Sequence, residues 1–381
     1  MDFSLTEEQK MLKAMARDFA IKELEPIATR IDEESRFPAE SVKKMAELGL
    51  TGIGFPEKYG GSSGGAMELC LVIEEISRAC AATATILLAS TGLAGEPIYV
   101  HGNEEQRKRF ITSIAAGGNL AAFALTEAGA GSDPASLETT ATRDKSGYRL
   151  NGTKIFITNG AEAGIILVFA TVDKSLRHKG ITSFIVEKDT PGFSVGKHEP
   201  KLGIRGSSTV ELVFADCFVP EKNRLGNEGE GFKIALSAID ASRAVVAAQA
   251  LGIAQGAFDK ALAYAKERQQ FGQPIINFQA IQWMLADMAT QIDAARLLTH
   301  RAACLQDNGQ PFIKEASMAK VFAAETSSFV TNKAVQIFGG YGYIKEYPLE
   351  RYLRDAKITE IYEGTSEMQR MTIARQLMRE G

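Results

Sequence analysis

The stretch Tyr148-Arg-Leu-Asn-Gly-Thr-Lys-Ile-Phe-Ile-Thr158 decides the fold class of this chain. It contains two runs in which apolar and polar residues alternate, one on each side of Asn151-Gly152. Alternation with a period of two is typical of a half-buried strand, and Asn-Gly between two such runs is typical of a two-residue turn. The stretch therefore predicts a β-hairpin, which makes the middle third of the chain β structure.

Further runs rich in β-branched and aromatic residues surround this stretch at short spacing. They are Ile165 to Ala170, Ile181 to Glu187 and Val210 to Phe214. Runs of 4 to 8 such residues are typical of strands. The strand pattern begins near Leu120 and ends before residue 228, so we expect a β-barrel-like middle domain over residues 120–227.

The two flanks of this region have helical patterns. Thr6-Glu-Glu-Gln9 predicts a capping box at the start of the first helix, and glycine and proline break the helices that follow. Beyond residue 228, three long alanine-rich amphipathic runs are joined by short turns: Phe232 to Arg268, Phe278 to Gln306 and Pro311 to Phe338. Helices connected in this way form antiparallel bundles. The predicted fold class is α+β, with a helical domain (1–119), the β domain (120–227) and a C-terminal four-helix bundle (228–381).

Composition excludes several functional classes. The chain has 381 residues, 45% of them hydrophobic and 24% charged, which is ordinary for a soluble globular protein of two or three domains. A net charge of -4, with no basic run interleaved with aromatics, argues against nucleic-acid binding. No unbroken apolar run approaches the ~18 residues that span a bilayer. Four cysteines without CxxC spacing and only four histidines argue against a metal site; with an acidic N-terminus, they predict a cytoplasmic protein.

The segment Ile361-Tyr-Glu-Gly-Thr-Ser-Glu367 carries the candidate catalytic group. Glu363 lies on a short joint between two helical runs, and Gly364 permits a sharp turn and close approach to a ligand. A carboxylate so placed can project into a cavity and act as a general base, although a solvated glutamate at a helix end fits the same pattern. Ser366 with Gln369 predicts a capping box that opens a last helix through Met378.

Two glycine-rich stretches complement Glu363. In Phe123 to Pro134, the pair Asp133-Pro134 predicts an N-cap followed by proline at the first helical position. Just upstream, Gly129, Gly131 and Ser132 would expose backbone N–H groups to an anionic or polar ligand, unless this is an ordinary loop.

The second stretch, Gln336-Ile-Phe-Gly-Gly-Tyr-Gly-Tyr343, ends a long helix. Neither stretch is a Rossmann fingerprint or a P-loop, so a phosphate-bearing cofactor would be held in another way.

Together the three motifs resemble the acyl-CoA dehydrogenase family, and the resemblance runs from residue 1 to 381. Ala124 through Ser136 matches the family's first signature, and Gln336 through Asp355 matches its second. Ile361 to Glu367 resembles the catalytic segment of the short-chain, butyryl-CoA type. The resemblance implies an oxidoreductase of fatty acid β-oxidation that removes hydrogen from the α and β carbons of an acyl-CoA.

The resemblance also implies FAD. The matching positions are Phe123, Leu125, Thr126, Gly131, Ser132, Phe156, Ile157, Thr158, Arg268, Phe271, Gln279, Gln336, Gly339, Gly340, Thr365 and Glu367. Many relatives have tryptophan where Phe156 stands. Arg268 and Phe271 match residues that reach the cofactor of a neighbouring subunit, which implies a homo-oligomer, commonly a tetramer.

In the family mechanism, Glu363 removes the α-proton while the β-hydride passes to flavin N5. The implied substrate-binding residues are Ser132, Asp240, Arg243, Tyr362 and Gly364. Asp240 and Arg243 can instead form a local helix salt bridge. Another branch of the family carries its base where Ser242 stands, and a serine cannot take that role.

A linear short-chain acyl group is the first expectation for the substrate. The small, partly polar run Ala89 to Ala94 lies near the distal acyl end in the family, so a branched or alicyclic group is an alternative. The implied electron acceptor is an electron-transferring flavoprotein. An oxygen-using acyl-CoA oxidase and a catalytically silent CoA-ester-binding scaffold are the rival functions.

Overall fold

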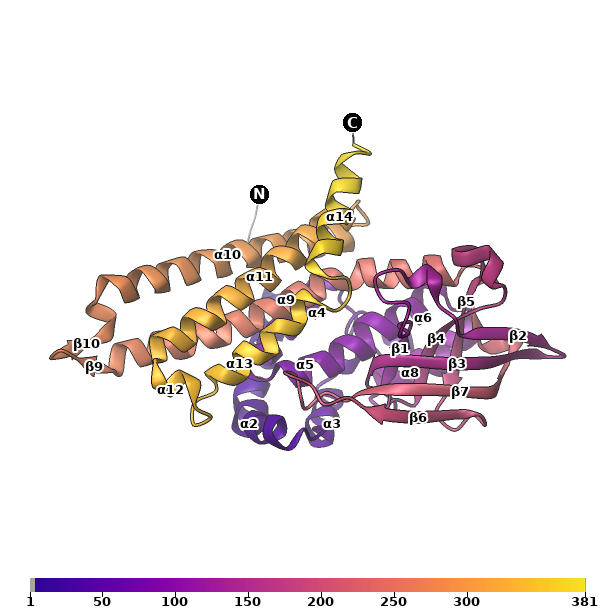
Figure 1. Ribbon diagram of the computed structural model, residues 1–381, viewed down its shortest axis with the longest axis horizontal. Coiled ribbons are helices and arrows are strands. Elements are labelled where there is room, and N and C mark those ends of the chain that lie inside the picture. Colours follow the sequence, from indigo (N-terminus) through magenta and orange to yellow (C-terminus); the bar gives the residue numbers. More distant parts are fainter. Residues whose placement is uncertain (1–3, 381) are drawn as a thin grey trace.

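The computed structural model describes residues 4–380 and has the expected three-part architecture. Figure 1 shows an elongated molecule in which a β-sheet occupies one end and long helices run toward the other. The α+β class with helical, β and helical parts is confirmed, while the exact domain boundaries at 119/120 and 227/228 stay a prediction.

The N-terminal part is a set of helices with a largely buried second half. The helices are α1 (Glu7–Phe19), α2 (Glu25–Glu34), α3 (Ala39–Glu47), α4 (Ala66–Ala79), α5 (Ala81–Leu87), α6 (Glu96–His101), α7 (Glu104–Gln106) and α8 (Thr112–Ala115), with π-helical turns at Ala20–Leu24, Leu88–Gly95 and Arg107–Ile111. The predicted capping box is confirmed, because Thr6 accepts from the backbone of Gln9 and the Gln9 side chain accepts from Thr6.

The middle part is one eight-stranded sheet. Its strands are β1 (Ala121–Ala124), β2 (Thr140–Asp144), β3 (Gly147–Thr158), β4 (Ile165–Thr171), β5 (Ile181–Glu187), β6 (Phe193–His198), β7 (Thr209–Pro220) and β8 (Arg224–Leu225). The order is β6-β7-β3-β2-β4-β5-β8, and β1 pairs in parallel with β4.

The predicted hairpin at Asn151-Gly152 is wrong. These residues lie inside the continuous strand β3, where the register with β7 shifts between Leu150 and Gly152. Gly152 has a φ of 151°, and a Cβ at this position would lie 2.5 Å from the hydroxyl of Thr139. The glycine thus serves a β-bulge, and the turn falls at residues 145–146, between β2 and β3.

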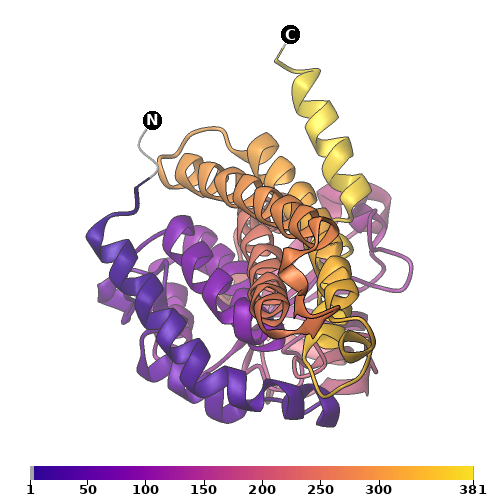
Figure 2. The ribbon, with the colours of Figure 1, turned by 90° about the vertical axis from the view of Figure 1, so that its left-hand side faces the viewer.

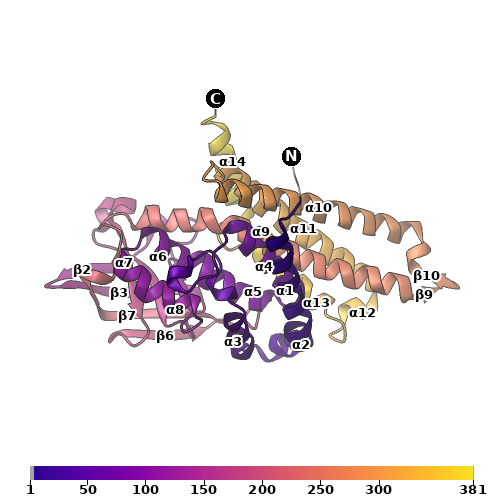
Figure 3. The same cartoon turned by 180° about the vertical axis from the view of Figure 1, so that it is seen from behind.

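The C-terminal part contains the three long predicted helices, each confirmed to within about two residues. It comprises α9 (Gly231–Glu267), the hairpin β9 (Gln269–Gln270) and β10 (Gln273–Pro274), α10 (Gln279–Asp307), α11 (Ile313–Phe338), α12 (Gly340–Tyr343), α13 (Leu349–Ala356) and α14 (Ser366–Leu377). Figures 1 and 2 show α9, α10 and α11 packed side by side while α14 projects away from them. From behind, α4 lies against α9, so a helix of the N-terminal part covers the remaining side of this bundle (Figure 3).

Helix α9 is the central core helix. Within residues 4–380 it alone is long and apolar enough to cross a membrane, but 78% of its most hydrophobic window is buried inside the protein. The sequence contains no unbroken apolar run of that length, as stated above, but the mean hydropathy of part of α9 is high enough for a membrane span. Buried Ser242, Arg243 and Gln249 interrupt its apolar surface, and these polar residues face the candidate site.

Candidate active site

Glu363 lies on the joint between the 3-10 turn Lys357–Glu360 and α14, as predicted. Its φ is 51°, and that of Gly364 is 91°. A left-handed conformation is unfavourable for a glutamate, and such strain concentrates at functional sites. Two consecutive left-handed residues turn the chain sharply, which presents the Glu363 side chain to the bundle instead of along a helix face.

The start of α14 differs from the prediction. Thr365, not Ser366, is the N-cap, and its hydroxyl accepts from the backbone N–H of Met368 at 3.3 Å. The Gln369 amide turns back to the carbonyl oxygens of Glu363 (3.2 Å) and Gly364 (2.9 Å) instead of completing a capping box. The proposed Ser366–Gln369 box is therefore wrong, because Gln369 is used to hold the joint.

Residues from two other helices fix the base. The Ser242 hydroxyl, on α9, donates to Oε2 of Glu363. The Lys320 ammonium, on α11, donates to the carbonyl oxygen of Gly364 at 2.7 Å. Sequence reasoning considered Ser242 only as a failed base and missed Lys320 and Gln369 as neighbours of the site, since no local pattern links positions on separate helices.

The environment adjusts the acidity of Glu363. Burial raises the pKa of its carboxyl to about 7, against the opposing effects of the Ser242 hydrogen bond and the positive charges of Lys320 and Arg243. A pKa near neutrality lets one carboxyl group both accept and return a proton at physiological pH, as general acid–base catalysis requires.

Asp240 and Arg243 form the local ion pair considered above, at 2.7 Å within one turn of α9. Arg243 also donates to the Ser317 hydroxyl at 2.8 Å, yet its Nε is buried without a partner. Buried polar groups are nearly always hydrogen-bonded. The unpaired Nε therefore leaves a donor for a ligand, and the substrate-binding role of this pair stays a prediction.

A second group of predicted residues gathers where β1 and β3 meet. The backbone N–H of Ile155 donates to the carbonyl oxygen of Thr126 at 2.9 Å, which joins the two segments. A register shift between Lys154 and Ile157 gives Phe156 a φ of 58° and leaves its side chain 59% exposed. The bulge thus exposes the aromatic side chain of Phe156, next in sequence to Ile155, which bonds to Thr126.

A buried ion pair holds this region together. Lys154 is fully buried and donates to Glu127 at 2.7 Å and to the carbonyl oxygen of Leu125 at 2.9 Å. Burial raises the pKa of Glu127, but the charge and hydrogen bond of Lys154, together with hydrogen bonds from Thr139 and the Glu138 backbone, outweigh this effect, and the pKa lies below its ordinary value. This pair, which no local sequence pattern indicates, fixes the loop after β1 against β3.

The loop after Glu127 has the open backbone expected of a ligand cradle. A Cβ added to Gly129 or Gly131 would have no atom within 4 Å, and Ser132 is exposed. The predicted helical start at Asp133 is a single 3-10 turn, Pro134–Ser136, and Asp133 gives it no side-chain cap. Asp133 is therefore the N-cap residue with proline at the first position, as predicted, but its side chain forms no capping hydrogen bond.

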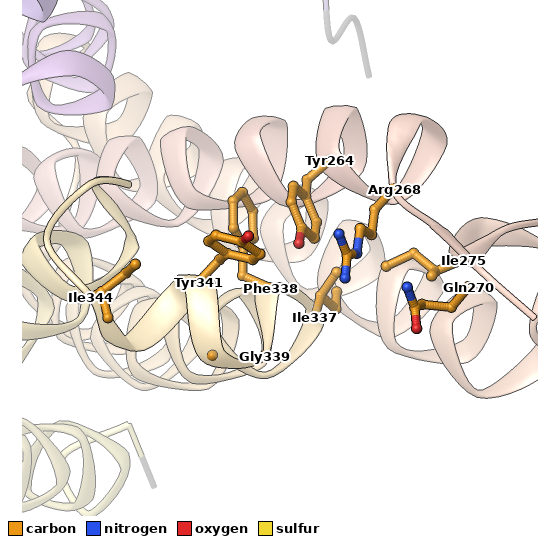
Figure 4. Close-up of a pocket in the computed structure, with 10 residues that line it drawn as sticks. Tyr264, Arg268, Gln270, Ile275, Ile337, Phe338, Gly339, Tyr341 and Ile344 are labelled. Atoms are coloured by element: carbon orange, nitrogen blue, oxygen red, sulfur yellow. The ribbon is translucent and has the colours of Figure 1, made fainter.

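A separate pocket of about 450 Å³ lies at the tip of the helical bundle. Figure 4 shows the Tyr264 ring of α9 beside Phe338, on which it stacks with ring centroids 3.9 Å apart. Arg268, directly after α9, lies over the Tyr341 ring at 5.7 Å. The other lining residues are Gln270, Ile275, Ile337, Gly340 and Ile344. Sequence matching had named Arg268, Gly339 and Gly340, and the structure brings these three together.

The remaining predicted residues fall into three groups. Phe271 (93% exposed, φ 51°), Gln279 and Gln336 are exposed at the tip of the helical bundle. Glu367 is exposed at the start of α14. Leu125 and Ile157 have buried side chains, and Phe123 packs on Phe169 with ring centroids 4.9 Å apart, so we expect these three to act through backbone or packing. The Tyr362 hydroxyl is occupied, because it donates to Gln249.

Three family models cover nearly the whole described chain. They are the N-terminal, middle and C-terminal domains of acyl-CoA dehydrogenase, which match residues 6–118, 122–217 and 229–378. The chain belongs to the acyl-CoA dehydrogenase family. This is a family of flavoproteins.

Several relatives match this member of the acyl-CoA dehydrogenase family over nearly their full length. The acryloyl-CoA reductase (NADH) of Anaerotignum propionicum is 55% identical over 381 residues, which is 100% of this chain and 96% of the relative. The butyryl-CoA dehydrogenase of Megasphaera elsdenii is 48% identical with a TM-score of 0.98, and both chains are covered completely. A chain solved in work on the electron transferring flavoprotein of Acidaminococcus fermentans has 50% identity and a TM-score of 0.98, again with complete coverage of both.

Proposed function

We propose that this protein catalyses the FAD-dependent α,β-dehydrogenation of a short-chain acyl-CoA to the trans-2-enoyl-CoA, with Glu363 as the base. The observation that carries the proposal is the state of Glu363: a left-handed joint presents it, a serine hydroxyl orients it, and burial raises its pKa to about 7. A solvated helix-end glutamate would have none of these properties. The similarity to a butyryl-CoA dehydrogenase supports the short acyl chain.

The residues present fit FAD at two places. The exposed Phe156 ring and the neighbouring Thr126 and Thr158 suit the isoalloxazine ring, while Arg268 with the open backbone of Gly339 suits a pyrophosphate and adenosine. When bound, FAD supplies the acceptor for the β-hydride.

In this proposal one FAD contacts both places, which belong to different copies of the chain. Figure 1 shows the pocket end of the bundle, marked by β9 and β10, far along the molecule from β1 and β3. Phe271, at the tip of that end, is 93% exposed. A cofactor shared between the Phe156 region of one copy and the Arg268 pocket of another accounts for both facts, and it makes the active unit a homo-oligomer, which we take to be a tetramer.

The chain's own residues perform the proton chemistry. Ser132, Asp240 and the unpaired Nε of Arg243 hold the CoA portion, and the thioester lies beside Glu363. The backbone N–H of Glu363 stabilises the negative charge that develops on the thioester oxygen as the α-proton leaves. The bound acyl chain excludes water and raises the pKa of Glu363 further, so the carboxylate becomes a stronger base.

The same site supports reduction of an enoyl-CoA as a second candidate function. A relative at 55% identity is named an acryloyl-CoA reductase, and a Glu363 pKa of about 7 populates the protonated form that returns a proton to the α-carbon. We therefore propose reversible chemistry. The electron carrier in either direction is an electron-transferring flavoprotein, a proposal supported by the similarity to a chain from that structural work.

The decisive experiment is anaerobic mixing of the FAD-loaded protein with a panel of acyl-CoAs, including branched and alicyclic ones, while the visible flavin absorbance is followed. Bleaching by butyryl-CoA in the wild type and its loss in Glu363→Gln, with FAD retained, is the expected result. Bleaching that survives in Glu363→Gln would remove Glu363 from its role. No bleaching by any acyl-CoA would favour a silent scaffold, and rapid oxygen uptake in air would favour an oxidase.

A further inference from the structure

Two buried side chains hold the joint that carries Glu363 through hydrogen bonds to its backbone carbonyl groups. Lys320 is fully buried, and its ammonium donates to the carbonyl oxygen of Gly364 at 2.7 Å. Gln369 is 1% exposed, and its amide donates to the same oxygen at 2.9 Å and to that of Glu363 at 3.2 Å. The two consecutive carbonyl groups on either side of the turn are thus held by a charged donor from α11 and a neutral donor from α14.

This grip opposes an unfavourable backbone conformation. A glutamate does not favour a φ of 51°, so the intrinsic backbone preference of Glu363 does not stabilise this conformation. Gly364, with a φ of 91°, allows the chain to change direction. Strained residues persist only where the surroundings over-determine them. A buried ammonium is also costly unless it is paired, so its placement at Gly364 calls for a role that a smaller apolar residue could not perform.

We propose that Lys320 is a positioning residue for proton abstraction: together with Gln369 it holds the Glu363–Gly364 turn so that the carboxylate faces the substrate α-carbon. This inference rests on the proposed function, because it assigns Lys320 a task only if Glu363 is the base. Lys320 acts through the backbone of the joint, because its ammonium donates to the carbonyl oxygen of Gly364.

The charge of Lys320 adds an electrostatic consequence. Glu363 is faced by Ser242, Arg243 and, beyond Arg243, Asp240 from α9, by Lys320 from α11 and by its neighbour Tyr362. Around Lys320 lie Glu363, Arg243, Glu360 and Glu367. Burial lowers the pKa of Lys320 to about 8, and the ammonium lowers the pKa of Glu363. Removing the ammonium therefore raises the pKa of Glu363 and moves the acid limb of dehydrogenation to higher pH.

The test compares Lys320→Met, which keeps length and removes charge, with Lys320→Arg and with Lys333→Met, a partly exposed lysine on the same helix. Hydrogen bonds to charged groups correspond to roughly a tenfold to hundredfold effect, so we expect the kcat of Lys320→Met to fall by about that factor with KM changed less than about twofold. Its acid limb should move to higher pH, Lys320→Arg should restore the limb toward its wild-type position, and Lys333→Met should match the wild type.

Two further measurements keep the outcome decisive. A crystal structure of Lys320→Met should show the 363–364 turn displaced, a readout that needs no turnover. If Lys320→Met does not fold, Gln369→Met removes the other donor to the carbonyl groups of the 363–364 turn, and the same fall in kcat is expected. Wild-type kcat with an unmoved acid limb in a folded Lys320→Met protein overturns the inference. Bleaching retained in Glu363→Gln overturns the proposed function instead, so the two failures are distinguishable.

Discussion

Substitution of Ser242 by alanine isolates the hydrogen bond that orients the base. The Ser242 hydroxyl donates to Oε2 of Glu363, and this bond favours the ionised carboxylate. A hydrogen bond to a charged group contributes about 1.5–3 kcal/mol, and one pKa unit corresponds to about 1.4 kcal/mol. We therefore expect Ser242→Ala to raise the pKa of Glu363 by about 1–2 units above its value of about 7.

The sign of the pH effect follows from which form of Glu363 reacts. Dehydrogenation needs the carboxylate, so a raised pKa lowers the reactive fraction at neutral pH. At pH 7 the ionised fraction falls from about one half to between about a tenth and a hundredth, and kcat/KM for butyryl-CoA falls about fivefold to fiftyfold. Well above pH 9 the difference should shrink. Reduction of an enoyl-CoA needs the protonated acid, so its alkaline limb moves upward in the same variant.

The assay is the anaerobic rate of flavin bleaching, measured from pH 5.5 to pH 10 at low substrate concentration, where it reports groups of the free enzyme. Ser237→Ala is the matched control, because Ser237 lies on the same helix but its hydroxyl contacts His101 and the carbonyl oxygen of Ile234. An acid limb at the same pH in Ser242→Ala and in the wild type would refute the reasoning, since the hydroxyl would then have no influence on the base.

Three further predictions concern the buried ion pair beside β3, the turn next to the base and the separate pocket at the bundle tip. Replacing Lys154 by methionine should leave the buried Glu127 carboxylate without its charge partner and destabilise the protein by about 3–5 kcal/mol, measured as a lower midpoint in chemical denaturation; an unchanged midpoint would contradict this. Gly364→Ala should lower kcat at least about tenfold while FAD is retained, because the new Cβ would lie 2.8 Å from the Gln369 amide and because alanine disfavours the left-handed backbone of this position. Wild-type turnover in this variant would show that the turn is not required. Arg268→Gln should weaken FAD retention on gel filtration by about tenfold in apparent affinity without moving the pH limb, since its pocket lies away from Glu363; full retention would exclude the pocket from cofactor binding.

Periodicity in the sequence was sufficient to predict the architecture. The alternating runs after Leu120 and the long alanine-rich runs after Gly231 each produced the expected element type, because local patterning and burial agree there. The Asn151-Gly152 error shows the limit of local chemistry. The same dipeptide serves a turn or a bulge, and the long strand β7 that pairs across it decides for the bulge.

The candidate site was predictable only where one short segment contains it. Glu363 and the open glycine loop were visible because their residues are neighbours in sequence. Ser242, Lys320 and the grip of Gln369 were not, since three separate helices bring them to Glu363. The capping-box pattern at Ser366 predicted a different role for Gln369, whose amide donates to two carbonyl groups of the joint and does not cap the helix.

The most direct test of Glu363 as the base separates proton removal from hydride transfer. Acetyl-CoA has α-hydrogens but no β-carbon to oxidise, so incubation of the FAD-loaded protein with acetyl-CoA in D₂O, followed by proton NMR, reports abstraction at the α-carbon alone. We expect the wild type to exchange these hydrogens for deuterium and Glu363→Gln to leave them in place. Equal exchange by the two proteins would show that another group removes the proton.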